Sequence, residues 1–458
     1  MENFPPNSSI FNRLKLRTIT TLLLLLSITL FSTSCEKEDD IAAPRVTNIG
    51  ITADTTITLG SRVTLTPSQY SLPGTTFQWK INGTVVSTEP NYLFEPDNVG
   101  IFKIEYQATN KSGVASKEAT ITVKKYYRGI IIINEGWFGH ENGSVNYFNL
   151  NTNSQHLNAF KENNSGLDLG TTTQYGTIEN GNLYMISKMG QSIVVADAYT
   201  MKSKGSLTLE SNISARAFTS VNEQYGILTT SIGAFKLTLN PLSIQESLSG
   251  LEDVNERRRQ CGAVYASGKY IFVISQEKGA LIYNSNTMEL VKTIEGIEVG
   301  FARTKDGNLW ASKNQTELVR INPSTLETTE YPLPESVKIH NSWGAWNAGS
   351  LCAAHKENAL YFTKAGMWGG GNAIYKYIPG QESSLDQIFA RGEDDDAFYG
   401  ASIRVDPTTD NIVATYTKSG WGAGFSDNRL VIFSGKTGEE IKRITYDHYW
   451  FPSMILFN

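Results

Sequence analysis

Cysteine is scarce in this chain, which has 3 in 458 residues. Cys35 lies near the N-terminus, whereas Cys261 and Cys352 stand far apart from each other. Small secreted domains that depend on disulfides have dense, regularly spaced cysteines, so a disulfide framework is excluded as the source of stability. We expect Cys261 and Cys352 to be small buried side chains.

Histidine and positive charge are also in short supply. The 5 histidines are scattered without metal-ligand spacing, and the net charge is −5. These features speak against a metal site and against nucleic acid as a partner. No phosphate-binding loop, dinucleotide fingerprint or nucleophile elbow is present in a suitable context. We therefore expect no cofactor, no catalytic residue and no enzymatic activity, although a catalytic pair assembled from separate repeats stays open.

Long apolar runs are missing except at residues 22–31, and this run is too short to span a bilayer comfortably. Basic residues precede it, and the small residues 32–34 follow it. This pattern is typical of a signal peptide over residues 1–34. Cys35 then resembles the lipidated first residue of a lipoprotein. The charged, Ala/Pro-containing segment 35–44 is predicted to be a tether from the outer membrane.

Short alternating strands fill residues 45–124. Asn82 and Gly83 form the expected tight turn of a hairpin. The segment resembles an immunoglobulin-like or PKD-type β-sandwich, in which Trp79 matches the core tryptophan and Tyr106 the late-strand tyrosine, without a cysteine pair. A module of this kind is usually a spacer.

One unit recurs from residue 128 to the end of the chain. Its clearest element is a strand that ends in a polar turn, and seven copies begin at residues 144, 192, 233, 279, 317, 373 and 429. The spacing suits four strands per repeat, which is typical of the blades of a β-propeller. We predict an all-β protein in which residues 128–458 form a seven-bladed propeller.

The first repeat lacks an innermost strand, and the last repeat has surplus chain. Residues 124–128 lead directly into the second strand at 129–134, whereas residues 451–457 follow a complete seventh repeat. We predict that the C-terminal segment supplies the missing strand and closes the ring, which removes exposed sheet edges.

Three loops between second and third strands are longer than the others and contain glycine and aromatic residues. They belong to repeats 1, 6 and 7, which are neighbours in a closed ring, and their flanking connections are also rich in tryptophan. Large aromatics on a rigid scaffold are typical of a site for a bulky, partly apolar ligand. The predicted ligand-binding residues are Trp137, Phe138, His140, Arg259, Trp343, Trp346, Trp368, Tyr399, Trp421, Phe425, Tyr449 and Trp450.

Plainer interpretations exist for each of these features. The aromatic rings could pack between blades. The basic run 257–259 could meet an anionic group, but a solvated turn is the simpler interpretation. The acidic run 393–396 lacks the alternating ligand spacing of a calcium loop, so it is predicted to be a solvated turn.

Segments 133–139, 404–410 and 449–454 resemble the YncE-like propellers of gut-bacterial surface lipoproteins. The resemblance covers about residues 128–458. It implies a lipid-anchored outer-membrane protein exposed at the cell surface, which captures a nutrient, with cobalamin as the first ligand to test, and works beside a TonB-dependent transporter. Two alternatives remain: a surface glycan-binding or adhesion protein, and a propeller lyase-type enzyme.

Overall fold

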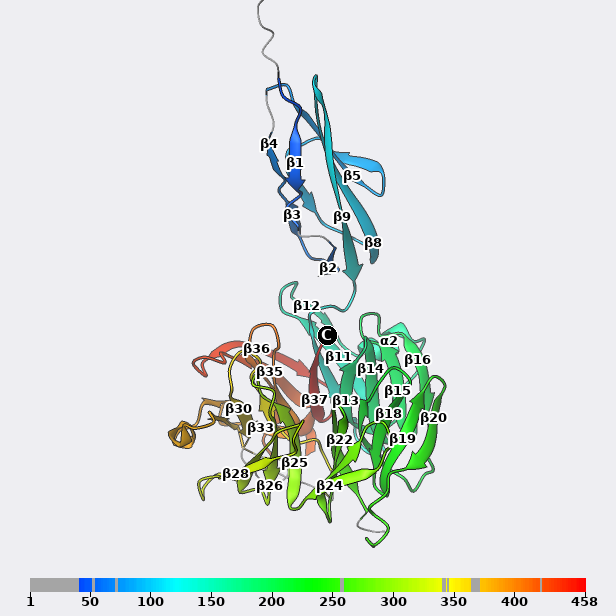
Figure 1. The fold of residues 1–458 in the computed structure, drawn as a ribbon, viewed down its shortest axis with the longest axis vertical. Helices are drawn as coiled ribbons and strands as arrows, with labels where there is room; N and C mark the ends of the chain where they lie inside the picture. Colours follow the sequence, from blue (N-terminus) through cyan, green and yellow to red (C-terminus); the bar gives the residue numbers. More distant parts are fainter. Residues whose placement is uncertain are drawn as a thin grey trace, which may run out of the picture. The chain divides into compact units, whose positions relative to one another are not determined.

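The structure is a computed structural model. It describes residues 41–51, 54–70, 73–255, 259–339, 343, 346–363, 371–420 and 422–458. The chain divides into two compact units, whose main boundary in the sequence falls between Thr122 and Val123. Figure 1 shows that strands dominate both units. Among the described residues, no helix is long and apolar enough to cross a membrane.

The N-terminal unit is a β-sandwich. Its largest sheet has the order β2-β9-β8-β5-β6, and two-stranded sheets pair β1 with β4 and β3 with β7. The strands are β1 (Arg45–Asn48), β2 (Thr55–Thr58), β3 (Val63–Leu65), β4 (Ser68–Tyr70), β5 (Thr76–Ile81), β6 (Thr84–Ser87), β7 (Tyr92–Phe94), β8 (Gly100–Asn110) and β9 (Gly113–Lys124).

The sandwich core forms around the two aromatic residues that the sequence indicated. Trp79 and Tyr106 are fully buried, and their ring centroids lie 4.6 Å apart. The indole Nε1 of Trp79 donates a hydrogen bond to the Glu89 carbonyl oxygen at 3.1 Å, so its polar atom is satisfied. The prediction of an immunoglobulin-like core is confirmed.

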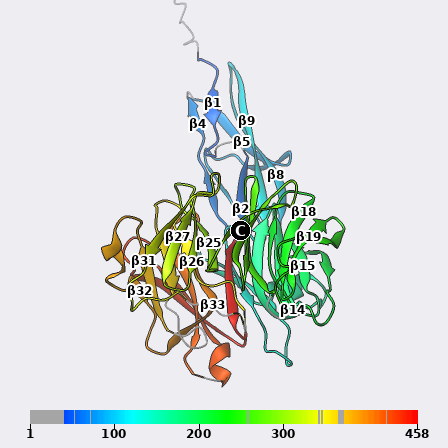
Figure 2. The same cartoon turned by 60° about the horizontal axis from the view of Figure 1, so that its bottom comes forward.

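The C-terminal unit consists of four-stranded antiparallel groups arranged around an axis (Figure 2). The first three complete sheets contain β13 (Thr171–Glu179), β14 (Asn182–Met189), β15 (Ile193–Asp197) and β16 (Ser203–Leu207); β17 (Ala215–Ser220), β18 (Tyr225–Thr230), β19 (Gly233–Leu239) and β20 (Leu242–Ser247); and β21 (Cys261–Ser267), β22 (Tyr270–Ser275), β23 (Gly279–Asn284) and β24 (Leu290–Ile294). Two more contain β25 (Ile297–Arg303), β26 (Leu309–Lys313), β27 (Glu317–Ile321) and β28 (Thr328–Pro332); and β29 (Cys352–Ala353), β30 (Leu360–Thr363), β31 (Ala373–Tyr377) and β32 (Ala390–Arg391).

An eight-stranded sheet completes the ring, in the order β12-β11-β10-β37-β33-β34-β35-β36. Its first half contains β10 (Ile130–Asn134), β11 (Ser144–Asn149), β12 (Ser154–His156) and β37 (Pro452–Phe457). Its second half contains β33 (Asp396–Val405), β34 (Ile412–Lys418), β35 (Asp427–Phe433) and β36 (Glu440–Asp447). The C-terminal strand β37 pairs antiparallel with β10, so the predicted closure of the ring is confirmed.

Hydrophobic side chains fill the space between neighbouring sheets. Ile131 and Ile133 of β10, for example, pack in one buried cluster with Leu183 and Met185 of β14. Cys261 and Cys352 are both unpaired and buried within such clusters, as predicted. Among the residues that the structure describes, helical structure is limited to α2 (Ala159–Asn163), which connects β12 to β13, and to the 3-10 turns η2 (Glu382–Leu385) and η3 (Gly422–Ser426).

Candidate functional site

The connections β10–β11 and β36–β37 place a group of aromatic rings at one end of the ring of sheets. The Trp137 ring is stacked with that of His140, with centroids 3.8 Å apart, and with that of Trp450, 4.6 Å apart. Because Trp137 stacks with both neighbours, the group is organised before any ligand arrives. Phe138 is 64% exposed and Trp137 42% exposed, so both rings remain available at the surface.

Phe451 joins this group to the neighbouring sheet. Its ring centroid lies 5.8 Å from that of Trp450 and 4.8 Å from those of Tyr399 and Phe425. Rings from four separate segments of the chain therefore form one continuous surface. We call it the aromatic loop surface, and its members are Trp137, Phe138, His140, Tyr399, Phe425, Trp450 and Phe451.

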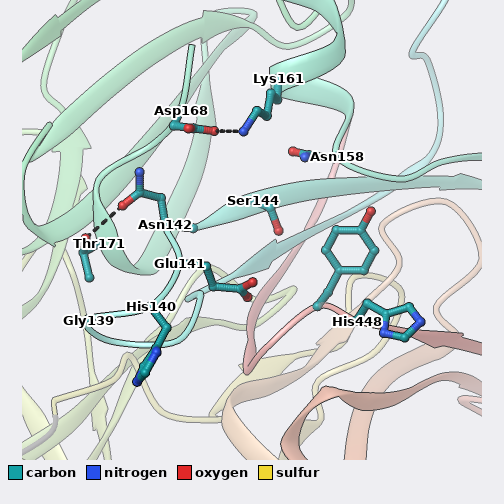
Figure 3. A pocket seen from close by; sticks show the side chains of 12 residues that line it. Gly139, His140, Glu141, Asn142, Ser144, Asn158, Lys161, Asp168, Thr171 and His448 are labelled. Atoms are coloured by element: carbon teal, nitrogen blue, oxygen red, sulfur yellow. Dashed lines mark hydrogen bonds and ion pairs between the residues drawn. The ribbon is translucent and has the colours of Figure 1, made fainter. Parts of the chain in front are cut away.

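A cavity of about 650 Å³ adjoins the aromatic loop surface. Figure 3 shows His140, Glu141 and Asn142 on one side of it and His448 on another. The wall from the β12–β13 connection carries Lys161, which forms an ion pair with Asp168 at 2.8 Å. The lining is therefore mostly polar and contains groups of both charges, next to exposed aromatic surface.

A buried carboxyl lies beneath the rings. Glu135 is 6% exposed, and its Oε2 accepts a hydrogen bond from the Tyr399 hydroxyl at 2.9 Å. Burial raises the pKa of Glu135, although the nearby Lys188 and the Tyr399 hydrogen bond oppose the rise. Burial likewise lowers the pKa of Lys188. Glu135 and Lys188 are therefore two partly desolvated polar groups close to the aromatic rings.

Trp343 and Trp346 occupy a different place. Both pack in the cluster formed by β17 to β23, and Trp346 is only 4% exposed. The guanidinium of Arg216 lies 5.7 Å from the Trp343 ring centroid and 5.9 Å from that of Trp346. Burial lowers the pKa of Arg216 to about 10. These two tryptophans are thus packed beside a buried arginine that also bonds Gln260.

The remaining predicted residues fall into three groups. Tyr449 lines the polar cavity and is half-buried. Arg259 is half-buried in the connection from β20 to β21. Trp368, Trp421 and the lipidation residue Cys35 lie outside the described residues.

The prediction of a solvated turn at residues 393–396 is wrong for its last member. Asp396 is 3% exposed, and its Oδ2 lies 2.9 Å from Arg443 Nη1 while its Oδ1 lies 3.3 Å from Arg429 Nε. Asp396 begins β33, and its carboxylate faces inward to the two arginines of β35 and β36. A buried aspartate paired with two guanidiniums is an internal ion-pair network, not a solvated turn.

Glu135 and Phe451 also belong to this region, although neither was among the residues predicted from the sequence. Glu135 directly follows the buried strand β10, and a carboxyl at that position was a detectable signal. Phe451 precedes β37 and has a φ of 57°, so its ring direction is determined by a backbone turn that the sequence pattern does not reveal.

Together, the fold and these rings define a two-domain protein with a β-propeller that carries an aromatic surface at one end. The chain belongs to the family described as Domain of unknown function (DUF5074), which matches residues 128–458. Residues 51–110 match a PKD-like domain. No curated protein matches this chain.

Solved structures with the same fold have little sequence in common with it. A quinonprotein alcohol dehydrogenase-like protein of Bacteroides thetaiotaomicron is 19% identical, with 91% of this chain and 99% of that chain covered and a TM-score of 0.59. A protein of Lactobacillus plantarum is 10% identical, with 72% and 99% covered and a TM-score of 0.53. At these identities the likeness establishes the fold alone.

Proposed function

We propose that this chain is a lipid-anchored cell-surface protein whose propeller captures a nutrient at the aromatic loop surface without catalysing a reaction. One observation carries the proposal: an organised group of aromatic rings, in which Phe138 is 64% and Trp137 42% exposed, adjoins a cavity of about 650 Å³. Exposed rings next to convergent polar groups suit a bulky ligand with apolar faces and a polar periphery.

Cobalamin is the first ligand to test. Its corrin ring offers apolar faces to the exposed Phe138 and to the stacked group that contains Trp137, while its amides and phosphate match the mixed polar lining supplied by Asn142 and Lys161. The resemblance to YncE-like surface lipoproteins supports the same ligand class. In this proposal Cys35 holds the protein on the outer membrane, and a TonB-dependent transporter receives the ligand.

The test is calorimetric titration of the full chain with cyanocobalamin. We expect Phe138→Ala and Trp137→Ala each to weaken binding about thirty-fold, the loss of roughly 2 kcal/mol that truncating a central aromatic anchor causes. Thermal unfolding of Phe138→Ala should hardly change, because the Phe138 ring is 64% exposed.

Tyr270→Ala is the control. Tyr270 begins β22 beside the β21–β22 turn, whereas the aromatic loop β10–β11 corresponds to the β22–β23 turn at the other end of the strand. Its affinity should equal that of the wild type. Absence of binding at micromolar cyanocobalamin would reject this ligand, and equal affinity of all three variants would reject the surface.

A surface glycan is the second candidate, and the composition of the cavity favours it. Asn142, Asn158 and Asp168 provide amide and carboxylate groups that can bond sugar hydroxyls beside the aromatic rings. Titration of the same variants with oligosaccharides distinguishes the two ligands, because the same substitutions should then weaken glycan binding and leave no cobalamin binding to measure.

A further inference from the structure

A second cavity, of about 420 Å³, lies inside the propeller. The inner strands β13, β21, β25, β29, β33 and β37 line it, so it occupies the central channel. Figure 2 shows β25, β33 and the red C-terminal strand near the centre of the ring. Its volume is within the range of small-molecule sites.

This cavity is at the opposite end of the channel from the aromatic loop surface. Strand β37 enters at Pro452, which pairs with Asn134 beside the aromatic loops. The cavity is lined instead by the later residues of that strand, from Met454 to Phe457. It is therefore a separate site from the one proposed above.

The basic residues that line the cavity are Arg303, Arg404 and His355. No aspartate or glutamate lines the cavity among the residues that the structure describes. A protein with a net charge of −5 thus keeps one interior pocket with cationic side chains and no described carboxylate.

Arg404 is held by neutral partners. Its Nη1 donates hydrogen bonds to the carbonyl oxygens of Ile403 at 2.7 Å and Gly349 at 3.4 Å, and its Nη2 lies 3.4 Å from Met454 Sδ. None of these partners carries a negative charge. Uncompensated positive charge inside a protein attracts an anion, because a charge-assisted hydrogen bond is stronger than a neutral one.

Neighbouring groups do not neutralise Arg404 either. Burial lowers the pKa of Arg404, and the acidic groups that oppose this are the Cys352 thiol and the Tyr175 phenol. Burial raises the pKa of Cys352 to about 12 and raises that of Tyr175 further. Both groups are therefore uncharged at neutral pH.

Arg303 is the accessible cation of the pocket. It is exposed at the end of β25, and no carboxylate pairs with it in the described part of the chain. Aromatic surface lies close by, since Phe301 and Tyr265 both line the cavity with ring centroids 6.4 Å apart. The pocket therefore combines a free guanidinium with an apolar wall.

We propose that this central-channel cavity binds a small organic anion, with its carboxylate or phosphate at Arg303 and Arg404 and its apolar body against Phe301 and Tyr265. A planar guanidinium matches both anionic groups through paired N–H donors. The remaining wall is mainly aliphatic, which suits an apolar body and disfavours a highly hydrated inorganic ion.

The experiment is titration of the full chain with α-naphthyl phosphate, compared with α-naphthol and with inorganic phosphate. We expect micromolar binding of the phosphate ester and at least tenfold weaker binding of either fragment. Arg303→Gln should weaken binding of the ester about tenfold, the effect of losing one charge-assisted hydrogen bond. Arg303 is chosen because it is exposed, so its substitution leaves the fold intact.

Phe301→Leu tests the apolar wall and should weaken the ester but not inorganic phosphate. Arg320→Gln is the matched control, because Arg320 lies in the same sheet, on β27, outside the cavity lining, and its affinity should be unchanged. Phe138→Ala should also leave ester binding intact, which separates this site from the aromatic loop surface. Equal binding of α-naphthol, no binding of the ester at millimolar concentration, or an unchanged affinity of Arg303→Gln would each overturn the proposal.

Discussion

At the scale of single residues, the aromatic end of the propeller contains a buried titratable carboxyl. Glu135 is held below the rings by Tyr399, and burial shifts its pKa above the ordinary value of 4.5. A protein usually tolerates such a group where it orients a neighbour or meets a ligand. Here the carboxyl fixes the Tyr399 ring, which in turn contacts Phe451.

Glu135 should make the stability of the propeller depend on pH. Below pH 4.5 both the folded and the unfolded chain hold this proton. As the pH rises, the unfolded chain releases it first, so the free energy of unfolding falls until the pH passes the raised pKa of the folded state. Urea unfolding at a series of pH values should therefore show that Glu135→Gln removes part of this decline.

Glu246→Gln is the control for that series. Glu246 is an exposed residue of β20 that pairs with Lys236 at 3.4 Å, and exposed pairs contribute little. Its substitution should leave the pH dependence unchanged. If Glu135→Gln and the wild type decline in parallel, the carboxyl does not carry the pH dependence.

At the scale of elements, the turns after the third strands β15, β23 and β27 repeat one arrangement. The side-chain oxygen of Asn322 accepts hydrogen bonds from the backbone N–H groups of Ser324 at 2.9 Å and Thr325 at 3.1 Å. Asn284 and Asp197 make the same pair of contacts in their own sheets. Such Asx turns set the direction in which the outer strand returns.

The sequence pattern of these turns is more specific than a polar turn alone. Each of these residues is followed three positions later by threonine, and the next residue, such as Leu326, has a positive φ. Strand positions were predictable because this turn recurs. The third strands begin within two residues of the predicted positions. The direction of individual loop rings was not predictable, since it depends on neighbouring loops far apart in sequence.

Asn322→Ala should lower the free energy of unfolding by about 1–2 kcal/mol, because two turn N–H groups lose their acceptor. Asn322→Asp is the matched control and should stay close to the wild type, since the aspartate of the equivalent turn at Asp197 serves in the same way. Urea unfolding measures both. Equal losses for the two variants would mean that the hydrogen bonds of the turn contribute nothing.

At the scale of the whole molecule, the closed ring explains why some predicted site residues meet and others do not. Trp137 and Trp450 are far apart in sequence, yet closure brings their loops together. That contact followed from the predicted order of strands. Trp346 shows the limit of this reasoning: loop position indicated the same face, but its ring lies in a buried cluster with Cys261. Sequence spacing gives the end of the propeller from which a loop emerges. Side-chain packing decides whether an aromatic side chain in that loop reaches solvent.

Deletion of residues 452–458 should unfold the propeller as a whole. Strand β37 supplies five residue pairs to β10 and also meets β33 where Ala401 faces Met454. Burial of Met454 and Ile455 contributes about 2 kcal/mol each, and each strand hydrogen bond about 1 kcal/mol. The loss approaches the roughly 5–15 kcal/mol by which domains are stable.

Calorimetry of the truncated chain should therefore show no cooperative transition from the propeller, while the sandwich unit, which has its own buried core around Trp79, still melts. Ile441→Ala in the full chain is the control, because Ile441 is 57% exposed on the outer strand β36 and its loss should barely change the transition.

Adding a peptide of residues 452–458 to the truncated chain should restore part of the propeller transition, since the strand binds by backbone pairing that needs no covalent link. A truncated chain that melts cooperatively at the wild-type temperature would mean that the ring is held by the contacts between the other sheets, and that its closure by the C-terminal strand is not what makes it stable.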